Sequence, residues 1–142
     1  MKKEDEWYKN RILWKANKEN LFDVNGIEFS KLSDKQKEYI KKIIPKDTIP
    51  VIVFWQDFNI WTVLCTQMLI SYYDSNLEIV EKDRLKQKKT LHIERYGKEI
   101  ENHEKKEAKW FYMTETKQYI WLPTSNDLWR FWPVLLTLSS LR

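Results

Sequence analysis

The stretch IPVIVFWQDFNIWTVLCTQMLISYYDSNLEIV, residues 49–80, decides the fold of this chain. It is rich in β-branched and aromatic residues, which favour strands. Two polar groups, Asp57-Phe58-Asn59 and Asp74-Ser75-Asn76, interrupt it and are typical of turns. Because short turns join antiparallel strands, whereas parallel pairing requires a long crossover, the stretch predicts an antiparallel meander. We expect its strands at residues 51–56, 61–66, 68–73 and 77–80.

Three further strands are predicted downstream, at residues 91–96, 108–114 and 118–122. The last two form a hairpin around Glu115-Thr116-Lys117. Residues 81–90 are polar and rich in lysine, which indicates a long connection. The charged segment 98–109 fits a strand extension, a loop or a short helix, and the sequence does not choose among them.

A buried helix is predicted near the C-terminus. Residues 124–127 are all good helix caps, and an apolar run follows them. Leu128, Trp132, Leu135 and Leu138 recur at helical spacing, so the helix has an apolar face that requires shelter. Pro133 lacks an N–H, which is harmless only in the first turn of a helix. We therefore expect the helix to begin near Trp129.

The N-terminal third predicts two helices. Residues 4–18 place apolar side chains near helical periods. A second helix begins after Ser33, because Ser33 and Gln36 form a capping-box pattern, and Pro45 ends it. We expect residues 1–48 to be a helical extension packed on a domain of residues 49–142, the whole forming one structural unit.

The segment WTVLCTQMLIS, residues 61–71, resembles a pair of strands in bacterial pleckstrin-homology-like proteins. YIWLP at 119–123 and FWPVL at 131–135 resemble their closing strand and helix. The resemblance covers about residues 49–141, with Pro133 and the insertion-like segment 98–109 as departures. It implies an α+β, mostly β fold, in which a barrel or sandwich of about seven antiparallel strands is closed by a C-terminal helix. Several such proteins are similar to immunity proteins of bacterial toxin systems, so it also implies a non-enzymatic role in protein binding.

Composition narrows the function classes. The 142 residues include 25 Lys and Arg against 21 Asp and Glu, a net charge of +4. Basic and acidic residues are interleaved, whereas nucleic-acid-binding segments are usually purely basic, so we expect no nucleic-acid partner. Gly26 and Gly97 are the only glycines, which excludes a glycine-rich phosphate-binding loop. The acidic residues Glu4 to Glu6 stand where a signal peptide is apolar, so we expect a cytoplasmic protein. The longest apolar runs, residues 49–55 and 134–138, are far shorter than the roughly 20 residues of a membrane span, so we expect no stable membrane insertion.

The sequence offers weak candidates for chemistry. His92 and His103, with Glu94, Glu99 or Glu101, have the ligand types of a zinc site. Nothing in the sequence holds the two histidines in register, so we expect no metal. Cys65, the only cysteine, lies in an apolar strand, and we expect a packing residue rather than a nucleophile. We expect no catalytic residue and no cofactor.

Two charged groups are candidate binding sites. Residues 45–80 hold a surplus of acid, and we expect it to contact a protein partner, a cognate toxin that the chain neutralises by steric occlusion. These acidic residues are Asp47, Asp57, Asp74 and Glu78. The net basic charge argues against a basic nuclease as that toxin. The alternative function is a peripheral membrane or phosphate-ligand module. It would use the basic residues Lys82, Arg84, Lys86, Lys88 and Lys89.

The eight tryptophans belong mainly to the core by their spacing. We place Trp61, Trp121, Trp129 and Trp132 there. Trp7 and Trp14 are different, because the helix that carries them lies outside the strand-rich region. Exposed aromatic side chains on that helix would indicate a partner surface.

Overall fold

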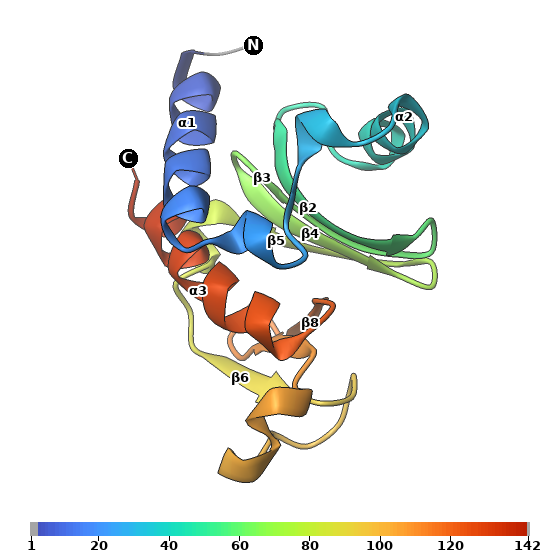
Figure 1. Cartoon of the computed structure of the whole chain (residues 1–142), viewed down its shortest axis with the longest axis vertical. Coiled ribbons are helices and arrows are strands. Elements are labelled where there is room, and N and C mark those ends of the chain that lie inside the picture. The colour runs from blue at the N-terminus through green and yellow to red at the C-terminus, as the bar shows by residue number, and fades with distance from the viewer. Residues whose placement is uncertain (1–2, 142) are drawn as a thin grey trace.

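The computed structural model describes residues 3–141 and has an α+β fold (Figure 1). Its helices and strands are α1 (Lys3–Lys18), β1 (Ile27–Glu28), α2 (Asp34–Ile43), β2 (Pro50–Asp57), β3 (Ile60–Cys65), β4 (Met68–Tyr73), β5 (Asn76–Glu81), β6 (Lys89–His92), β7 (Trp110–Met113), β8 (Gln118–Trp121) and α3 (Ser125–Ser140). Short 3-10 helices lie at η1 (Leu21–Asp23), η2 (Phe29–Lys31), η3 (Lys82–Arg84) and η4 (Asn102–Glu107).

The strands form two antiparallel sheets. The first has the order β1-β2-β3-β4-β5 and the second the order β6-β7-β8. The predicted meander is confirmed as β2 to β5, and the predicted hairpin is confirmed as β7 and β8. The sequence missed β1, because only Ile27 and Glu28 pair there, opposite Val53 and Ile52. The strand expected at 91–96 is shifted, since β6 begins at Lys89 and ends at His92.

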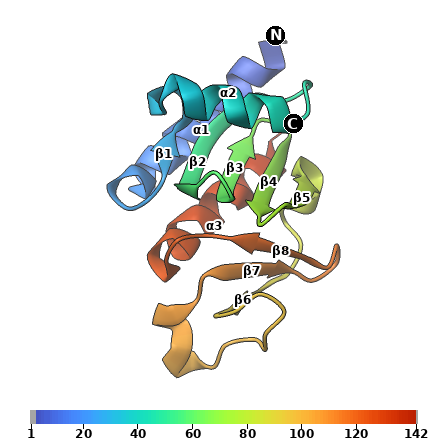
Figure 2. The same cartoon turned by 90° about the vertical axis from the view of Figure 1, so that its right-hand side faces the viewer.

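Both faces of the five-stranded sheet are covered. On one face, Val53, Val63 and Ile70 pack against Ile40 of α2. On the other face, side chains of the same strands pack with α1, α3 and the second sheet; they include Phe54, Leu64 and Leu69. Figure 2 shows α2 in front of this sheet and α3 behind it. The central strands are therefore buried almost without interruption, as expected of strands that are sheltered on two sides.

The helix α3 begins earlier than predicted. Thr124 caps it, with Asp127 completing a reciprocal capping box, so Pro133 lies well inside the helix. The expected start near Trp129 is wrong. A proline in a helix interior costs about 3 kcal/mol. Five fully buried apolar side chains outweigh that cost, because each contributes roughly 1.5–3 kcal/mol. They are Leu128, Phe131, Val134, Leu135 and Leu138.

The two sheets are joined by a ring of three hydrogen bonds. Trp121 lies on β8, the edge strand of the smaller sheet, and its N–H donates to Ser71 Oγ at 3.1 Å. Thr62 Oγ1 donates to the Trp121 carbonyl at 2.6 Å. The two hydroxyl oxygens are 2.8 Å apart. Since the Thr62 proton is already used, the Ser71 hydroxyl donates to Thr62, and every polar group of the ring is satisfied.

The expected fold class is confirmed in part. The α-helices hold about as many residues as the strands, so the fold is α+β but not mostly β. Within residues 3–141 the two sheets do not close into a barrel, and a pleckstrin-homology-like fold is not confirmed. The N-terminal segment is integral to packing, since Tyr8, Ile12 and Ala16 of α1 lie in the main core. Of the three structures considered for residues 98–109, a short helix is present as η4.

The expected core tryptophans divide into two groups. Trp61 and Trp121 are buried, as predicted. Trp132 is half-buried against the core, and Trp129 is 43% exposed, so its assignment to the core is wrong. The reason is geometric. Leu128 points inward, and each helical residue is rotated about 100° from the previous one, so Trp129 faces outward.

We predict that the Thr62–Ser71–Trp121 ring stabilises the whole fold. Thr62→Val and Ser71→Ala each leave a buried backbone group of Trp121 without a partner, so each lowers the free energy of unfolding by about 1–3 kcal/mol. The double variant loses less than the sum, because the bond between the hydroxyls is lost only once. Urea denaturation measures all three variants.

The matched control for this prediction is Thr137→Val on α3. The Thr137 hydroxyl is half-buried and makes no hydrogen bond to any residue between 3 and 141. The control therefore changes stability by less than about 0.5 kcal/mol. Equal effects of Thr62→Val and Thr137→Val would contradict the structural role of the ring.

Candidate functional site

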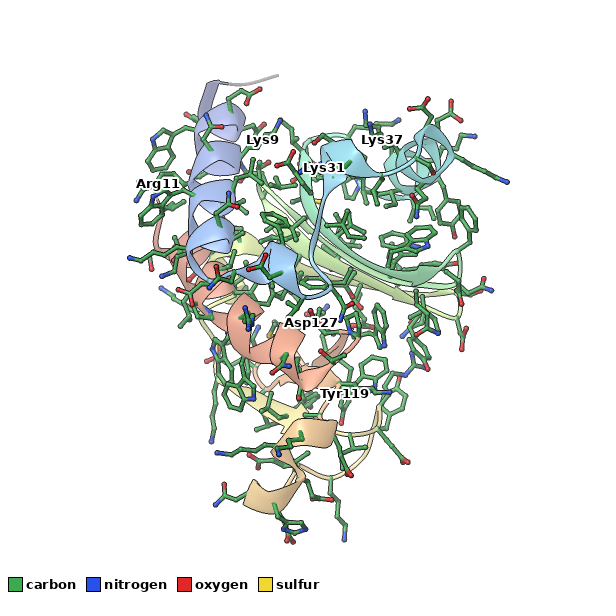
Figure 3. All side chains as sticks on the ribbon, in the orientation of Figure 1. Lys9, Arg11, Lys31, Lys37, Tyr119 and Asp127 are labelled. Carbon is green, nitrogen blue, oxygen red and sulfur yellow. The ribbon has the colours of Figure 1, made fainter. Side chains whose placement is uncertain are left out.

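The outer face of α1 carries aromatic and cationic side chains. Trp7, Arg11, Trp14 and Lys18 follow the spacing i, i+4, i+7, i+11, which places them along one side of the helix. Trp7 is 46% exposed and Trp14 is 51% exposed. Figure 3 shows Arg11 on the side of α1 that faces away from the rest of the molecule. This side of α1 is an exposed aromatic stripe on a helix whose other side is buried.

Two cations stack on the same indole ring. Arg11 Cζ and Lys18 Nζ each lie 5.1 Å from the centroid of the Trp14 ring. Cation–π contacts of this kind contribute about 0.5–1 kcal/mol at exposed sites. They restrict the rotamers of Trp14, so the Trp14 side chain loses less conformational entropy when a partner covers the ring.

The neighbouring helix α3 adds two exposed apolar side chains. Trp129 is 43% and Leu136 is 42% exposed. The Trp129 ring is stacked on Trp132 at 5.9 Å with an interplanar angle of 13°. Lys105 Nζ lies 5.9 Å from the Trp129 ring. The helices α1 and α3 pack together on one side of the molecule (Figure 1).

We call this surface the α1–α3 face and define it as Trp7, Arg11, Trp14, Lys18, Trp129 and Leu136. It holds four of the seven large apolar side chains exposed within residues 3–141. From the sequence, Trp7 and Trp14 are predicted to contact a partner if their side chains are exposed. The sequence prediction missed Trp129, which it placed in the core, and Leu136, although the helical spacing of the apolar face leaves both residues off that face.

The predicted acidic site is not assembled as a unit. Asp57 ends β2, and Asp74 lies in the turn after β4. The two turns at this end of the sheet are hydrogen-bonded to each other, since the Asp74 N–H donates to the Asn59 carbonyl at 2.8 Å. Asp47 precedes β2, at the opposite end of that strand. Glu78 lies within β5, opposite Ser71. Asp57 and Asp74 therefore share one tip of the sheet, and the other two acidic residues lie elsewhere.

The basic segment 82–89 is largely engaged within the protein. Lys82 Nζ lies 4.0 Å from the Tyr8 ring centroid and donates to the Leu141 carbonyl at 3.4 Å. Arg84 pairs with Glu115 at 3.1 Å. The remaining exposed cations of the segment are Lys86 and Lys88, because Lys89 is buried. Of the expected five-residue anion site, Lys86 and Lys88 are thus exposed without an internal partner within residues 3–141, and Arg84 is exposed but paired.

Lys89 is a buried cation held by backbone carbonyls. Its ammonium donates to the carbonyls of Leu85 and Gln87 and lies 5.7 Å from the Trp132 ring centroid. Burial disfavours the charged form and lowers the pKa of Lys89 to about 8. Lys89 therefore fixes the start of β6 and cannot reach an external anion.

The structure does not bring the two histidines together as a metal site. His92 is buried, with Nδ1 2.8 Å from the Gly97 carbonyl and Nε2 2.8 Å from Thr90 Oγ1. A carbonyl only accepts, so Nδ1 carries the proton and Nε2 accepts from the hydroxyl. His103 is exposed beside Glu101. Across the described range no three metal-ligating side chains converge.

Cys65 is fully buried, as expected of a packing residue. Burial raises the pKa of its thiol, so the sulfur stays protonated. Because the thiolate is the nucleophilic form of cysteine, the protonated Cys65 is not suited to nucleophilic attack.

Comparison with known proteins adds no identification. No family model, curated protein or solved structure matches this chain. The pleckstrin-homology-like resemblance stays a prediction drawn from residues 49–141. None of the helices in the described part of the chain is long and apolar enough to cross a membrane.

We predict a pH signature for Lys89. Its folded pKa of about 8 lies below its ordinary value of 10.5, so the unfolded chain binds more protons between these values. The free energy of unfolding therefore rises with pH in this window, by about 1.5 kcal/mol from pH 8 to pH 9.5. Lys89→Met removes this rise. Urea denaturation at both pH values measures it, and parallel pH dependences of the wild type and the variant would contradict it.

Proposed function

We propose that this chain is a non-enzymatic protein-binding protein that contacts its partner through the α1–α3 face. The observation that carries the proposal is the exposure of Trp7 and Trp14 on a helix whose opposite side is locked into the core. Tryptophan and arginine are enriched among the residues that dominate interface energies. A rigid helix that presents both is suited to binding, because little order has to be gained on association.

The charge of this surface favours an acidic partner. Arg11 and Lys18 flank Trp14, and Lys105 lies over Trp129. Glu4, one turn before Trp7, is an exposed carboxylate beside these cations. Complementary acidic groups on the partner would accelerate encounter and set the register of the complex.

The partner class that we propose is a bacterial toxin, which the chain neutralises as an immunity protein by covering the toxin's active site. The sequence resemblance supports this class. The cationic charge of the α1–α3 face narrows the class of toxin. This face would repel a basic nuclease and would attract a toxin with an acidic surface. The alternative, binding of an anionic membrane or phosphate through residues 82–89, has less support, since Lys89 is buried, Arg84 is paired with Glu115 and Lys82 lies over Tyr8.

Co-expression with the product of a neighbouring toxin gene provides the test. Co-expression of the wild type restores growth, whereas Trp7→Ala/Trp14→Ala does not. Each tryptophan of a hot spot contributes about 2 kcal/mol or more, so binding of the purified pair weakens at least tenfold per substitution. Isothermal titration calorimetry measures this change.

Phe58→Ala/Leu77→Ala is the matched control. Phe58 and Leu77 are 38% and 37% exposed, and both lie outside the α1–α3 face. Both double variants keep the melting temperature of the wild type to within a few degrees. Full protection by the Trp7/Trp14 variant would contradict the proposed face. Salt-sensitive binding to anionic vesicles that Lys86→Ala/Lys88→Ala abolishes would favour the alternative function.

A further inference from the structure

A cleft lies between the two sheets. It has a volume of about 400 Å³, which is within the range of small-molecule sites. One wall comes from the five-stranded sheet and carries Gln56 and Tyr73. The other wall comes from the smaller sheet and its flanking segments. Its residues include Arg95, Lys109, Trp110 and Trp121.

The aromatic walls of the cleft are rigid. Trp110 and Trp121 are cross-strand partners on β7 and β8, and both are almost fully buried. The Tyr73 ring meets the Trp110 ring edge to face at 4.9 Å. The ring of hydrogen bonds around Trp121 fixes these walls relative to each other. A flat ligand would therefore meet a preformed wall whose accessible aromatic area comes from the half-buried Tyr73, supported from below by Trp110.

Arg95 lies at this cleft with unused hydrogen-bonding capacity. Its Cζ is 5.1 Å from the Tyr73 centroid, 4.8 Å from Tyr96 and 5.9 Å from Trp110. Within residues 3–141 its guanidinium makes neither a salt bridge nor a hydrogen bond, in contrast to Arg84, which pairs with Glu115. Aromatic rings thus hold the guanidinium in place and leave its donors available. A planar fork held in this way matches a carboxylate or phosphate.

We propose that this cleft binds a small ligand that joins one anionic group to a flat aromatic ring. Arg95 receives the oxyanion, and Lys109 adds a second positive charge at the same wall. The aromatic ring of the ligand packs against Tyr73, the half-buried ring of the cleft. Glu94 also lines the cleft, which favours a ligand with a single anionic group over one with several.

Four probes test the proposal, because they separate the anion from the ring. Indole-3-acetate and adenosine monophosphate carry both parts, as a carboxylate and as a phosphate. Indole lacks the anion, and inorganic phosphate lacks the ring. We expect at least one of the first two to bind tenfold or more tightly than both indole and phosphate. The tighter of the two identifies the source of the anionic group. Calorimetry gives the affinities, and nuclear magnetic resonance shifts of the tryptophan indole N–H groups report the location.

Variants then assign the site to Arg95. Arg95→Gln and Arg95→Lys each weaken binding at least tenfold, since lysine retains the charge but loses the planar fork. Arg84→Gln, the control, leaves the affinity unchanged. The proposal fails if no probe exceeds indole and phosphate, or if Arg95→Gln binds as the wild type does. Because none of these residues belongs to the α1–α3 face, the outcome is independent of the toxin experiment.

Discussion

The edge of β8 is the constraint on which the arrangement of this protein depends. An unpaired edge strand presents backbone groups that must find partners, and here Trp121 finds them in the side chains of Thr62 and Ser71. The smaller sheet is thereby fixed on the face of the larger one rather than extending it. The chain turns from β8 into α3 within a few residues, so the same contact sets where that helix begins its path across the main core.

A second contact couples the N-terminal segment to α3. The carboxylate of Asp127 is fully buried and accepts hydrogen bonds from the backbone and side-chain N–H groups of Asn25 and from Thr124. These donors compensate for the loss of water around a buried charge. Since Asn25 follows α1 closely and Asp127 lies in the first turn of α3, the two helices are held in one orientation. The exposed tryptophans of the α1–α3 face therefore stand on a fixed platform.

The sequence predicted what local chemistry determines. The Ser33–Gln36 capping box depends on neighbours in the chain, and it is present. The same holds for the meander of β2 to β5 and for its two predicted turns, near residues 57–59 and 74–76. The contact between Thr62 and Trp121 joins residues 59 positions apart, and no periodic pattern encodes it. The candidate site divides in the same way. The position of the N-terminal helix outside the strand-rich region singles out Trp7 and Trp14, whereas the apolar run around Trp129 predicts burial for that residue and is wrong there.

The number of basic residues in a segment does not give the charge that it offers to a partner. Residues 82–89 have the densest positive charge in the sequence, yet folding pairs Arg84 with a carboxylate, places Lys82 over Tyr8 and buries Lys89 among carbonyls. In α1 the cations lie instead on an indole ring that is itself exposed, so charge and apolar area are presented together. Interface energy is concentrated where aromatic area is desolvated beside a complementary charge. For this reason we place the proposed partner contact on the N-terminal helix and not on the lysine-rich segment 82–89.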